Sequence, residues 1–125
     1  MPHVLIIDDE KSITEMISFA LIRAGFEVDV ASNGIEGINK YNKSYFDAVI
    51  TDIRMPGING NMVVHEIKKS NVQNTPVIGI SGTPWELLNG EFDAILPKPC
   101  SLKALVSTVR DVCHSSLQPA QIKSL

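Results

Sequence analysis

The sequence lacks several features that would indicate particular classes of protein. It contains no apolar run near the roughly 20 residues that a membrane-spanning helix needs. Its N-terminus shows no charged segment leading to an apolar stretch and a cleavage site, so we expect no secretory signal. A net charge of −3 without basic clusters gives no electrostatic signature of a nucleic-acid-binding or membrane-surface protein. We therefore expect a cytoplasmic domain that binds neither nucleic acid nor membrane directly.

Cysteine is also scarce. The 125 residues include only Cys100 and Cys113, which form no metal-binding or redox motif. We expect two buried free thiols in a reducing compartment rather than a disulfide. Length and composition are those of one globular domain, which we predict over residues 1–114. Residues 115–125 are predicted to be a polar C-terminal tail or linker stub.

Short apolar runs alternate with amphipathic stretches, at a spacing typical of βα units. The runs predict strands at residues 3–7, 26–31, 46–51, 76–80 and 94–96. Helical periodicity predicts helices at residues 12–24, 34–41 and 60–69, a short one at 84–89, and one from about 101 to 113. Ser12 and Glu15 fit a capping box, and Met62 is expected to face inward. This (βα)5 pattern predicts an α/β fold with a doubly wound parallel sheet.

Four of the apolar runs stop at polar residues that could take part in phosphoryl transfer. These residues are Asp8 with Asp9 after the first run, then Asp52, Ser81 and Lys98 after the third, fourth and fifth. Because the carboxyl ends of parallel strands meet at one edge of a sheet, we expect these side chains to converge there. Each residue alone fits an ordinary turn or loop position, but their joint placement favours a functional site.

The chemistry of each residue type suits such a site. Asp8 and Asp9 repel each other, and Mg²⁺ with its preference for oxygen ligands would relieve that repulsion. Asp52 could be a metal ligand or a nucleophile that forms an acyl phosphate. Ser81 could donate a hydrogen bond to a phosphoryl oxygen. Lys98, held between two prolines and followed by a Lys-Pro bond that can adopt the cis form, could neutralise phosphoryl charge.

In these motifs the sequence resembles the receiver domain of bacterial two-component response regulators, the CheY-like family. The resemblance extends from Val4 to about Cys113. It rests on the acidic pair, on the hydroxyl residue Ser81, on the Lys98-Pro99 pair, and on the segment Asp52-Ile53-Arg54-Met55-Pro56-Gly57-Ile58-Asn59-Gly60. The resemblance implies a flavodoxin-like sheet with strand order 2-1-3-4-5.

The resemblance also implies a function and a mechanism. Asp52 would accept a phosphoryl group from a sensor histidine kinase or a phosphotransfer protein, in a reaction that needs Mg²⁺. Asp9, Asp52 and the backbone carbonyl of Arg54 would hold the metal, with Asp8 acting through water. Ser81 and Lys98 would bind phosphoryl oxygens, and the domain would then change conformation to signal. Such a domain catalyses only its own phosphorylation and dephosphorylation; its downstream effector and any homodimer stay open.

Several positions depart from the pattern of that family. Ile95 stands three residues before Lys98, where the family usually has an aromatic switch residue. Only 16 residues separate Ser81 from Lys98, which shortens the helix expected at 84–89 and remodels the usual output face. Trp85 in that segment is expected to cap the core, and Gly82 replaces a frequent alanine. Arg54 and Thr83 occupy variable positions that influence the lifetime of the phosphoryl group.

Three other functions remain to be weighed. One is a receiver-like interaction module that no longer switches by phosphorylation, as the short helix would suggest. Another is an aspartate-nucleophile phosphatase, which would need a second aspartate two residues after Asp52, where this chain has Arg54. A third is a flavin-binding flavodoxin relative, which would need a hydroxyl- and glycine-rich loop in place of the acidic one after the first strand. The phosphorylatable receiver ranks first.

Overall fold

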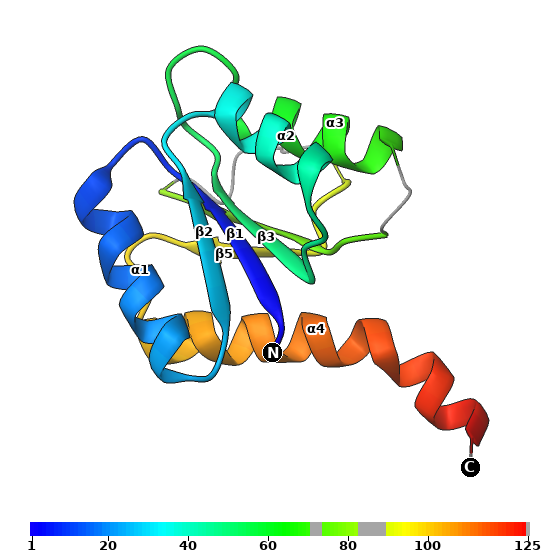
Figure 1. Cartoon of the computed structure of the whole chain (residues 1–125). Helices are drawn as coiled ribbons and strands as arrows, with labels where there is room; N and C mark the ends of the chain where they lie inside the picture. Colours follow the sequence, from blue (N-terminus) through cyan, green and yellow to red (C-terminus); the bar gives the residue numbers. More distant parts are fainter. Residues whose placement is uncertain (71–73, 83–89, 125) are drawn as a thin grey trace.

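A computed structural model describes residues 1–70, 74–82 and 90–124, with side chains as far as Cys113. From β1 to β4, strands and helices alternate along the chain (Figure 1). Their order is β1 (His3–Ile7), α1 (Lys11–Arg23), β2 (Glu27–Ala31), α2 (Gly34–Lys43), β3 (Ala48–Asp52), α3 (Gly60–Ser70), β4 (Val77–Ser81), β5 (Ala94–Pro97) and α4 (Leu102–Ser124). The predicted helix at 84–89, which includes Trp85, lies outside the described residues, and so does Thr83.

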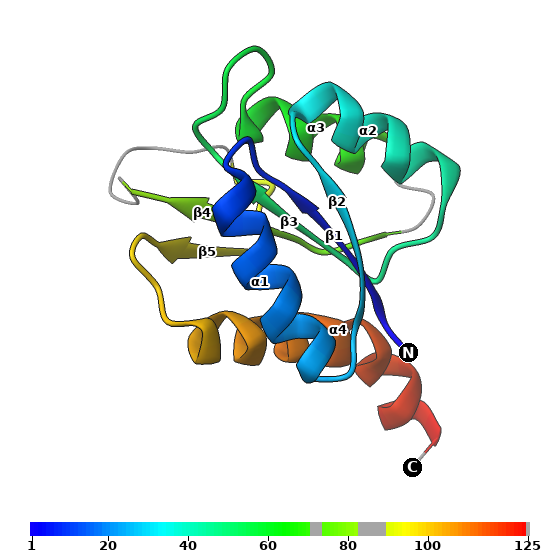
Figure 2. The same cartoon turned by 60° about the vertical axis from the view of Figure 1, so that its left-hand side comes forward.

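The five strands form one parallel sheet in the order β2-β1-β3-β4-β5, which confirms the predicted fold and strand order. Helices α1 and α4 cover one face of the sheet, and α2 and α3 cover the other (Figure 2). Both faces are buried, which is why β1, β3 and β4 read as continuous apolar runs in the sequence.

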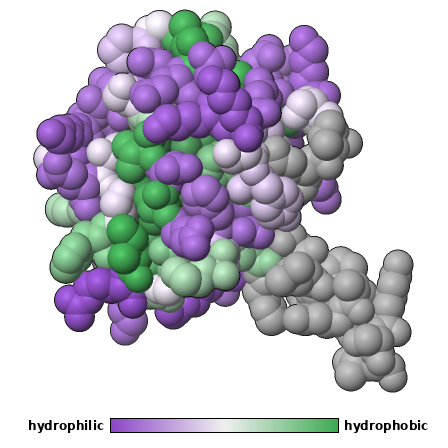
Figure 3. Space-filling model, in the orientation of Figure 1, coloured by the Kyte–Doolittle hydropathy of each residue, from purple (hydrophilic) through white to green (hydrophobic). Residues whose placement is uncertain are grey.

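Side chains that alternate along β1 divide between two hydrophobic cores. Val4 and Ile6 pack toward α1 and α4, whereas Leu5 and Ile7 pack toward α2 and α3. Strand β2 lies at an edge of the sheet, as its alternating sequence predicted; Glu27 is exposed and the next three residues are only partly buried. Figure 3 shows apolar side chains gathered where α1 runs beside this edge strand, and hydrophilic ones over α2.

The ends of the helices correct some details of the sequence interpretation. Helix α1 begins at Lys11 with Glu10 as its N-cap residue and without a side-chain cap, so the predicted Ser12 capping box is wrong. Ser12 instead lies within the first turn, because the helix starts one residue earlier than its periodicity indicated. By contrast, the Ser101 hydroxyl accepts a hydrogen bond from Ala104 N at 3.0 Å and caps α4.

Helix α4 continues to Ser124, eleven residues beyond the predicted end at Cys113. Proline inside a helix removes one backbone hydrogen bond and crowds the carbonyl four residues earlier, so the sequence around Pro119 did not indicate a continuous helix. Alanine, glutamine and lysine follow it, and all three have good helix propensity. The domain boundary at residue 114 stays a prediction. None of the helices that the structure describes is long and apolar enough to cross a membrane.

Two predictions of burial are also wrong. Met62 in α3 is 53% exposed, because Val63, Val64 and Ile67 supply the buried face of that helix. Cys113 is buried as expected, but Cys100 is only partly buried, since it lies in the loop between β5 and α4. Both cysteines are free thiols, as predicted.

Candidate functional site

Asp8 follows directly after β1 and is held by the backbone on both sides. Its N–H donates to the Ala31 carbonyl at 3.1 Å, which extends the pairing of β1 with β2 by one residue. Its carboxylate accepts a hydrogen bond from Glu10 N at 2.9 Å, which shapes the turn into α1. The side chain of Asp8 is 2% exposed, an unusual position for a carboxylate. The turn therefore directs a buried acid toward the carboxyl edge of the sheet.

Asp52 is the last residue of β3 and is 4% exposed. The loop after it is held by two backbone hydrogen bonds, from Ile53 N to Ile80 O at 3.1 Å and from Gly60 N to Ile53 O at 2.9 Å. A Cβ at position 60 would lie 2.7 Å from the Asp52 carbonyl oxygen and from Ile53 Cα. Glycine at this position lets α3 begin directly against the loop that carries Asp52.

Lys98 reaches the same point from the far side of β4. Its N–H donates to the Ser81 carbonyl at 2.7 Å, so its backbone is fixed beside the end of β4. The Lys98-Pro99 peptide bond is cis, as the sequence suggested. The Lys98 ammonium lies 3.2 Å from Asp52 Oδ1, forming an ion pair with one fully buried partner. The sheet therefore brings together Asp8, Asp52, Ser81 and Lys98, as predicted from the strand ends.

The cluster contains more carboxylates than cations. The pKa of Asp8 is raised from 3.8 to about 6, mainly by burial; the hydrogen bond from Glu10 N lowers it, and the nearby charge of Asp52 adds to the rise. For Lys98, partial burial alone would lower the pKa, but the charges of Asp52 and Asp8 outweigh it and the pKa is raised. The ammonium therefore stays protonated, while Asp8 resists ionisation in the absence of a further cation.

The donor set fits a small divalent cation. Carboxylate oxygens of Asp8, Glu10 and Asp52 all lie within 4.8 Å of one another. Hard oxygen ligands in this number suit Mg²⁺, which keeps several of its waters when it binds to proteins. Asp9, which the family resemblance implies as a direct ligand, does not belong to this group of three; Asp9 and Glu10 are both exposed. Glu10 was not selected from the sequence, because its position at the start of α1 depends on where the helix begins.

The remaining predicted site residues surround this cluster. Ser81 is 2% exposed at the end of β4, where the sequence placed it. Arg54 lies exposed in the loop two residues after Asp52. Ile95, at the usual aromatic position, is 37% exposed on β5 and does not enter either core. Thr83 lies outside the described residues.

Comparison with known proteins gives consistent matches. The family model for the response regulator receiver domain matches residues 4–110 of this chain. A transcriptional regulatory protein CpxR homolog from Haemophilus influenzae is 33% identical over 125 residues, covering 96% of this chain and 54% of that protein. The transcriptional regulatory protein TrcR from Mycobacterium tuberculosis is 30% identical, covering 91% of this chain and 46% of that protein. The chain thus spans about half the length of these curated relatives.

Solved structures show the same fold. A response regulator receiver domain protein from Clostridium thermocellum has a TM-score of 0.85 and 28% identity, covering 93% of this chain and 97% of that chain. The response regulator protein TrrA from Thermotoga maritima, solved in complex with Mg²⁺-BeF, has a TM-score of 0.82 and 31% identity, covering 90% of this chain and 99% of that chain.

Proposed function

Since the chain belongs to the response regulator receiver domain family, we propose that Asp52 is the residue through which it receives its signal. In this proposal Asp52 accepts a phosphoryl group from a phosphohistidine of a sensor histidine kinase or a phosphotransfer protein. The observation that carries the proposal is the pairing of the buried Asp52 carboxylate with Lys98 at 3.2 Å, beside the equally buried Asp8.

The residues divide the work of phosphoryl transfer among them. An Asp52 carboxylate oxygen attacks the phosphorus, the P–N bond to the donor imidazole breaks, and an acyl phosphate forms on Asp52. Lys98 neutralises negative charge on the transferred group, and the Ser81 hydroxyl donates to one of its oxygens. Position and charge supply most of the catalysis, so the domain catalyses only its own phosphorylation and the hydrolysis that resets it.

Mg²⁺ would neutralise the carboxylates and the incoming phosphoryl oxygens. Asp8 and Asp52 would hold it with the Arg54 carbonyl and with one further carboxylate, either Asp9 as the family pattern implies or Glu10 as the donor geometry favours. Comparing Mg²⁺ affinity in Asp9→Asn and Glu10→Gln distinguishes these two residues. The true ligand should lose at least about tenfold in affinity, and the other variant should stay close to wild type.

The family also indicates two kinds of partner, a phosphoryl donor and an effector. A two-component receiver needs a phosphohistidine donor, and the curated relatives named above are transcriptional regulators about twice as long as the match. We therefore propose a cytoplasmic domain, over residues 1–114, that controls an effector in the same or another chain. Residues 115–125 would connect to it, and dimerisation through the receiver would be one route of output.

Intact-mass spectrometry after incubation with acetyl phosphate and Mg²⁺ tests the acceptor. We expect one phosphoryl group on the wild type, none without Mg²⁺ and none on Asp52→Asn, with circular dichroism confirming that the variant is folded. Phosphorylation of the variant at another residue would disprove the role of Asp52. A protein that binds Mg²⁺ but accepts no group from acetyl phosphate or from any histidine donor would favour the interaction module that does not switch.

A further inference from the structure

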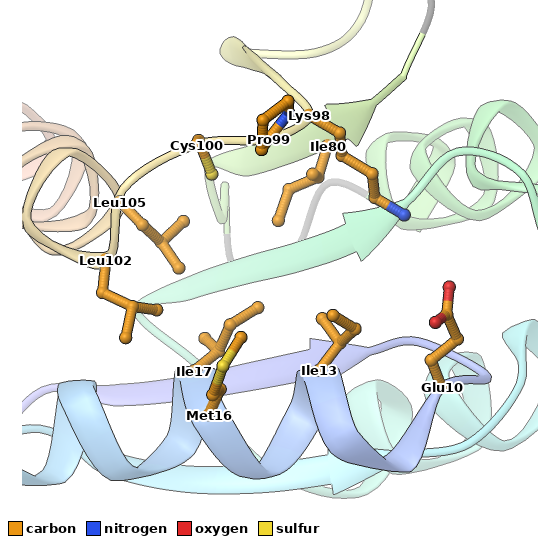
Figure 4. A pocket seen from close by; sticks show the side chains of 10 residues that line it. All are labelled: Glu10, Ile13, Met16, Ile17, Ile80, Lys98, Pro99, Cys100, Leu102 and Leu105. Atoms are coloured by element: carbon orange, nitrogen blue, oxygen red, sulfur yellow. The ribbon is translucent and has the colours of Figure 1, made fainter.

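Helices α1 and α4 pack side by side on one face of the sheet, and a surface groove lies between them (Figure 2). Its volume is about 590 Å³. It is separate from the neighbouring cavity in Figure 4, whose polar end carries Glu10 and Lys98 and therefore belongs to the candidate site at the sheet edge. Among the described residues, only Leu102 lines both. The chemistry of the groove is thus independent of the carboxylate cluster.

The charged side chains that line this groove are all cationic. They are Arg23 on α1 and Lys103 and Arg110 on α4. All three are exposed, and in the part of the chain that the structure describes none of them forms an ion pair with a carboxylate. Arg110 instead donates a hydrogen bond to the Ala24 carbonyl at 3.4 Å, which holds it against the end of α1. A protein with a net charge of −3 therefore carries unmatched positive charge in this groove.

Apolar side chains lie between these cations. The Phe19 ring is 63% exposed on the α1 wall, and the Arg23 guanidinium lies over it, 5.6 Å from the ring centroid. Leu102 and Val106 contribute apolar surface on the α4 wall. A ligand that carries both acidic and apolar groups would cover the ring and match the charges at the same time.

The spacing of the cations indicates the form of the ligand. Lys103 and Arg110 are seven residues apart on α4, so they lie on the same side of the helix, about 10 Å apart along it. In an extended polyproline II segment, side chains three residues apart share one side at a spacing of about 9 Å. A helix about 10 Å across and equally long would need roughly 800 Å³ and would stand partly outside the groove.

We propose that this groove binds a short, extended acidic segment of another protein, with two acidic residues three positions apart and apolar side chains between them. The carboxylates pair with Lys103 and Arg110, and the apolar side chains cover Phe19 and Val106. A second copy of this chain, docked symmetrically by the same groove, would place like charges opposite each other. A nucleic acid strand would extend past the cations and meet the negative charge of the rest of the protein.

Three capped hexapeptides test the charge requirement on the whole chain, in about 50 mM salt without Mg²⁺. Their sequences are Gly-Glu-Leu-Phe-Glu-Gly, Gly-Gln-Leu-Phe-Gln-Gly and Gly-Lys-Leu-Phe-Lys-Gly, which differ only at the two charged positions. Binding is followed by NMR shifts of the backbone amides of α1 and α4. For exposed ion pairs we expect a Kd on the order of 1 mM for the acidic peptide, roughly fivefold weaker binding of the neutral one, and no binding of the basic one.

Charge-reversal variants locate the binding. Lys103→Glu and Arg110→Glu should each weaken binding of the acidic peptide by about fivefold or more. Lys69→Glu makes the same change in total charge at an exposed position of α3, on the other face of the sheet, and should leave binding within about twofold of wild type. Phe19→Ala should weaken the acidic and neutral peptides alike. Ile22→Ala, at a similarly exposed position of α1 that does not line the groove, is its control.

The proposal is overturned if the acidic peptide does not bind the folded protein at about 10 mM, or if it binds no better than the basic peptide. It is also overturned if Lys69→Glu weakens binding as much as Lys103→Glu does, because attraction by overall charge would then explain the result. A thymidine decanucleotide that binds more tightly than the peptide would identify a nucleic acid as the occupant instead. None of these measurements involves phosphorylation, so failure of this proposal and failure of the role of Asp52 would be distinguished.

Discussion

Replacing Asp8 with asparagine should make the metal-free domain more stable at neutral pH. Asp8 is 2% exposed, and its burial together with the charge of Asp52 raises its pKa from 3.8 to about 6. The folded protein therefore holds a proton on Asp8 in a pH range where the unfolded chain has released it. Ionising the folded form above that range costs free energy that the unfolded chain does not lose. Asparagine has nearly the same shape and can still accept the hydrogen bond from Glu10 N.

The size of the effect follows from the pKa. One pKa unit corresponds to about 1.4 kcal/mol, so the rise from 3.8 to about 6 amounts to about 3 kcal/mol. We expect Asp8→Asn to raise the free energy of unfolding by about 2–3 kcal/mol at pH 7.5. The gain should shrink as the pH falls from about 6 to about 4, because Asp8 of the wild type then becomes protonated in the folded state. Below about pH 4 the two proteins should have similar stability.

Urea titrations with EDTA at pH 4, 5, 6 and 7.5 measure this difference. Asp9→Asn is the matched control, because Asp9 is exposed and outside the carboxylate group, and it should change stability by less than about 0.5 kcal/mol. Two results would refute the reasoning: an Asp8→Asn gain that does not depend on pH, or an equal gain in Asp9→Asn. Added Mg²⁺ should stabilise the wild type more than the Asp8 variant, since stabilisation by a ligand of the folded state grows with the logarithm of its affinity.

Three further changes test other parts of the structure. Gly60→Ala should destabilise the domain by about 1–3 kcal/mol in urea titrations and slow phosphorylation, since its Cβ would lie 2.7 Å from the Asp52 carbonyl oxygen. Gly82→Ala meets nothing within 4 Å among the residues that the structure describes and should be neutral in stability. Lys98→Ala should fold normally but lose the phosphorylation-driven change in its NMR spectrum, and a normal change would disprove its role. Leu105→Ala should cost about 2–5 kcal/mol in a urea titration, because Leu105 is fully buried in the core beneath α1.

The fold could be predicted well from the sequence because hydrophobic burial determines most of it. Strands with both faces covered, such as 4–7 and 48–50, need continuous apolar runs, and the helices need one apolar stripe each. The residues at which helices begin and end were less predictable. Helix α4 continues through Pro119 although proline disfavours a helix interior, and α1 starts without the Ser12 cap. Burial of apolar side chains decides neither limit. The exposure of Met62 was equally hard to predict. The apolar pattern of α3 allowed Met62 to face the core, but Val63 and Val64 occupy the buried face instead.

The position of the site was predictable, but the assignment of its acidic residues was less so. Parallel strands place Asp8, Asp52, Ser81 and Lys98 at one edge whatever the details of the loops. Choosing between Asp9 and Glu10 depends on the first turn of α1, where a shift of one residue rotates a side chain by about 100°. The sequence offers no signal that fixes this start, which the structure shows in the hydrogen bonds from Ile13 N and Thr14 N to the Glu10 carbonyl.

The same burial that weakens the isolated domain makes its site suited to phosphoryl transfer. Asp8 and Asp52 are almost inaccessible, and Lys98 is the cation that the structure places in ion-pair contact with Asp52. The uncompensated negative charge destabilises the metal-free fold, as the raised pKa of Asp8 indicates. A divalent cation bound there would recover that free energy and would also offset the charge of an incoming phosphoryl group. A receiver with solvated carboxylates would be more stable without metal, but it would bind the metal more weakly and respond less to phosphorylation.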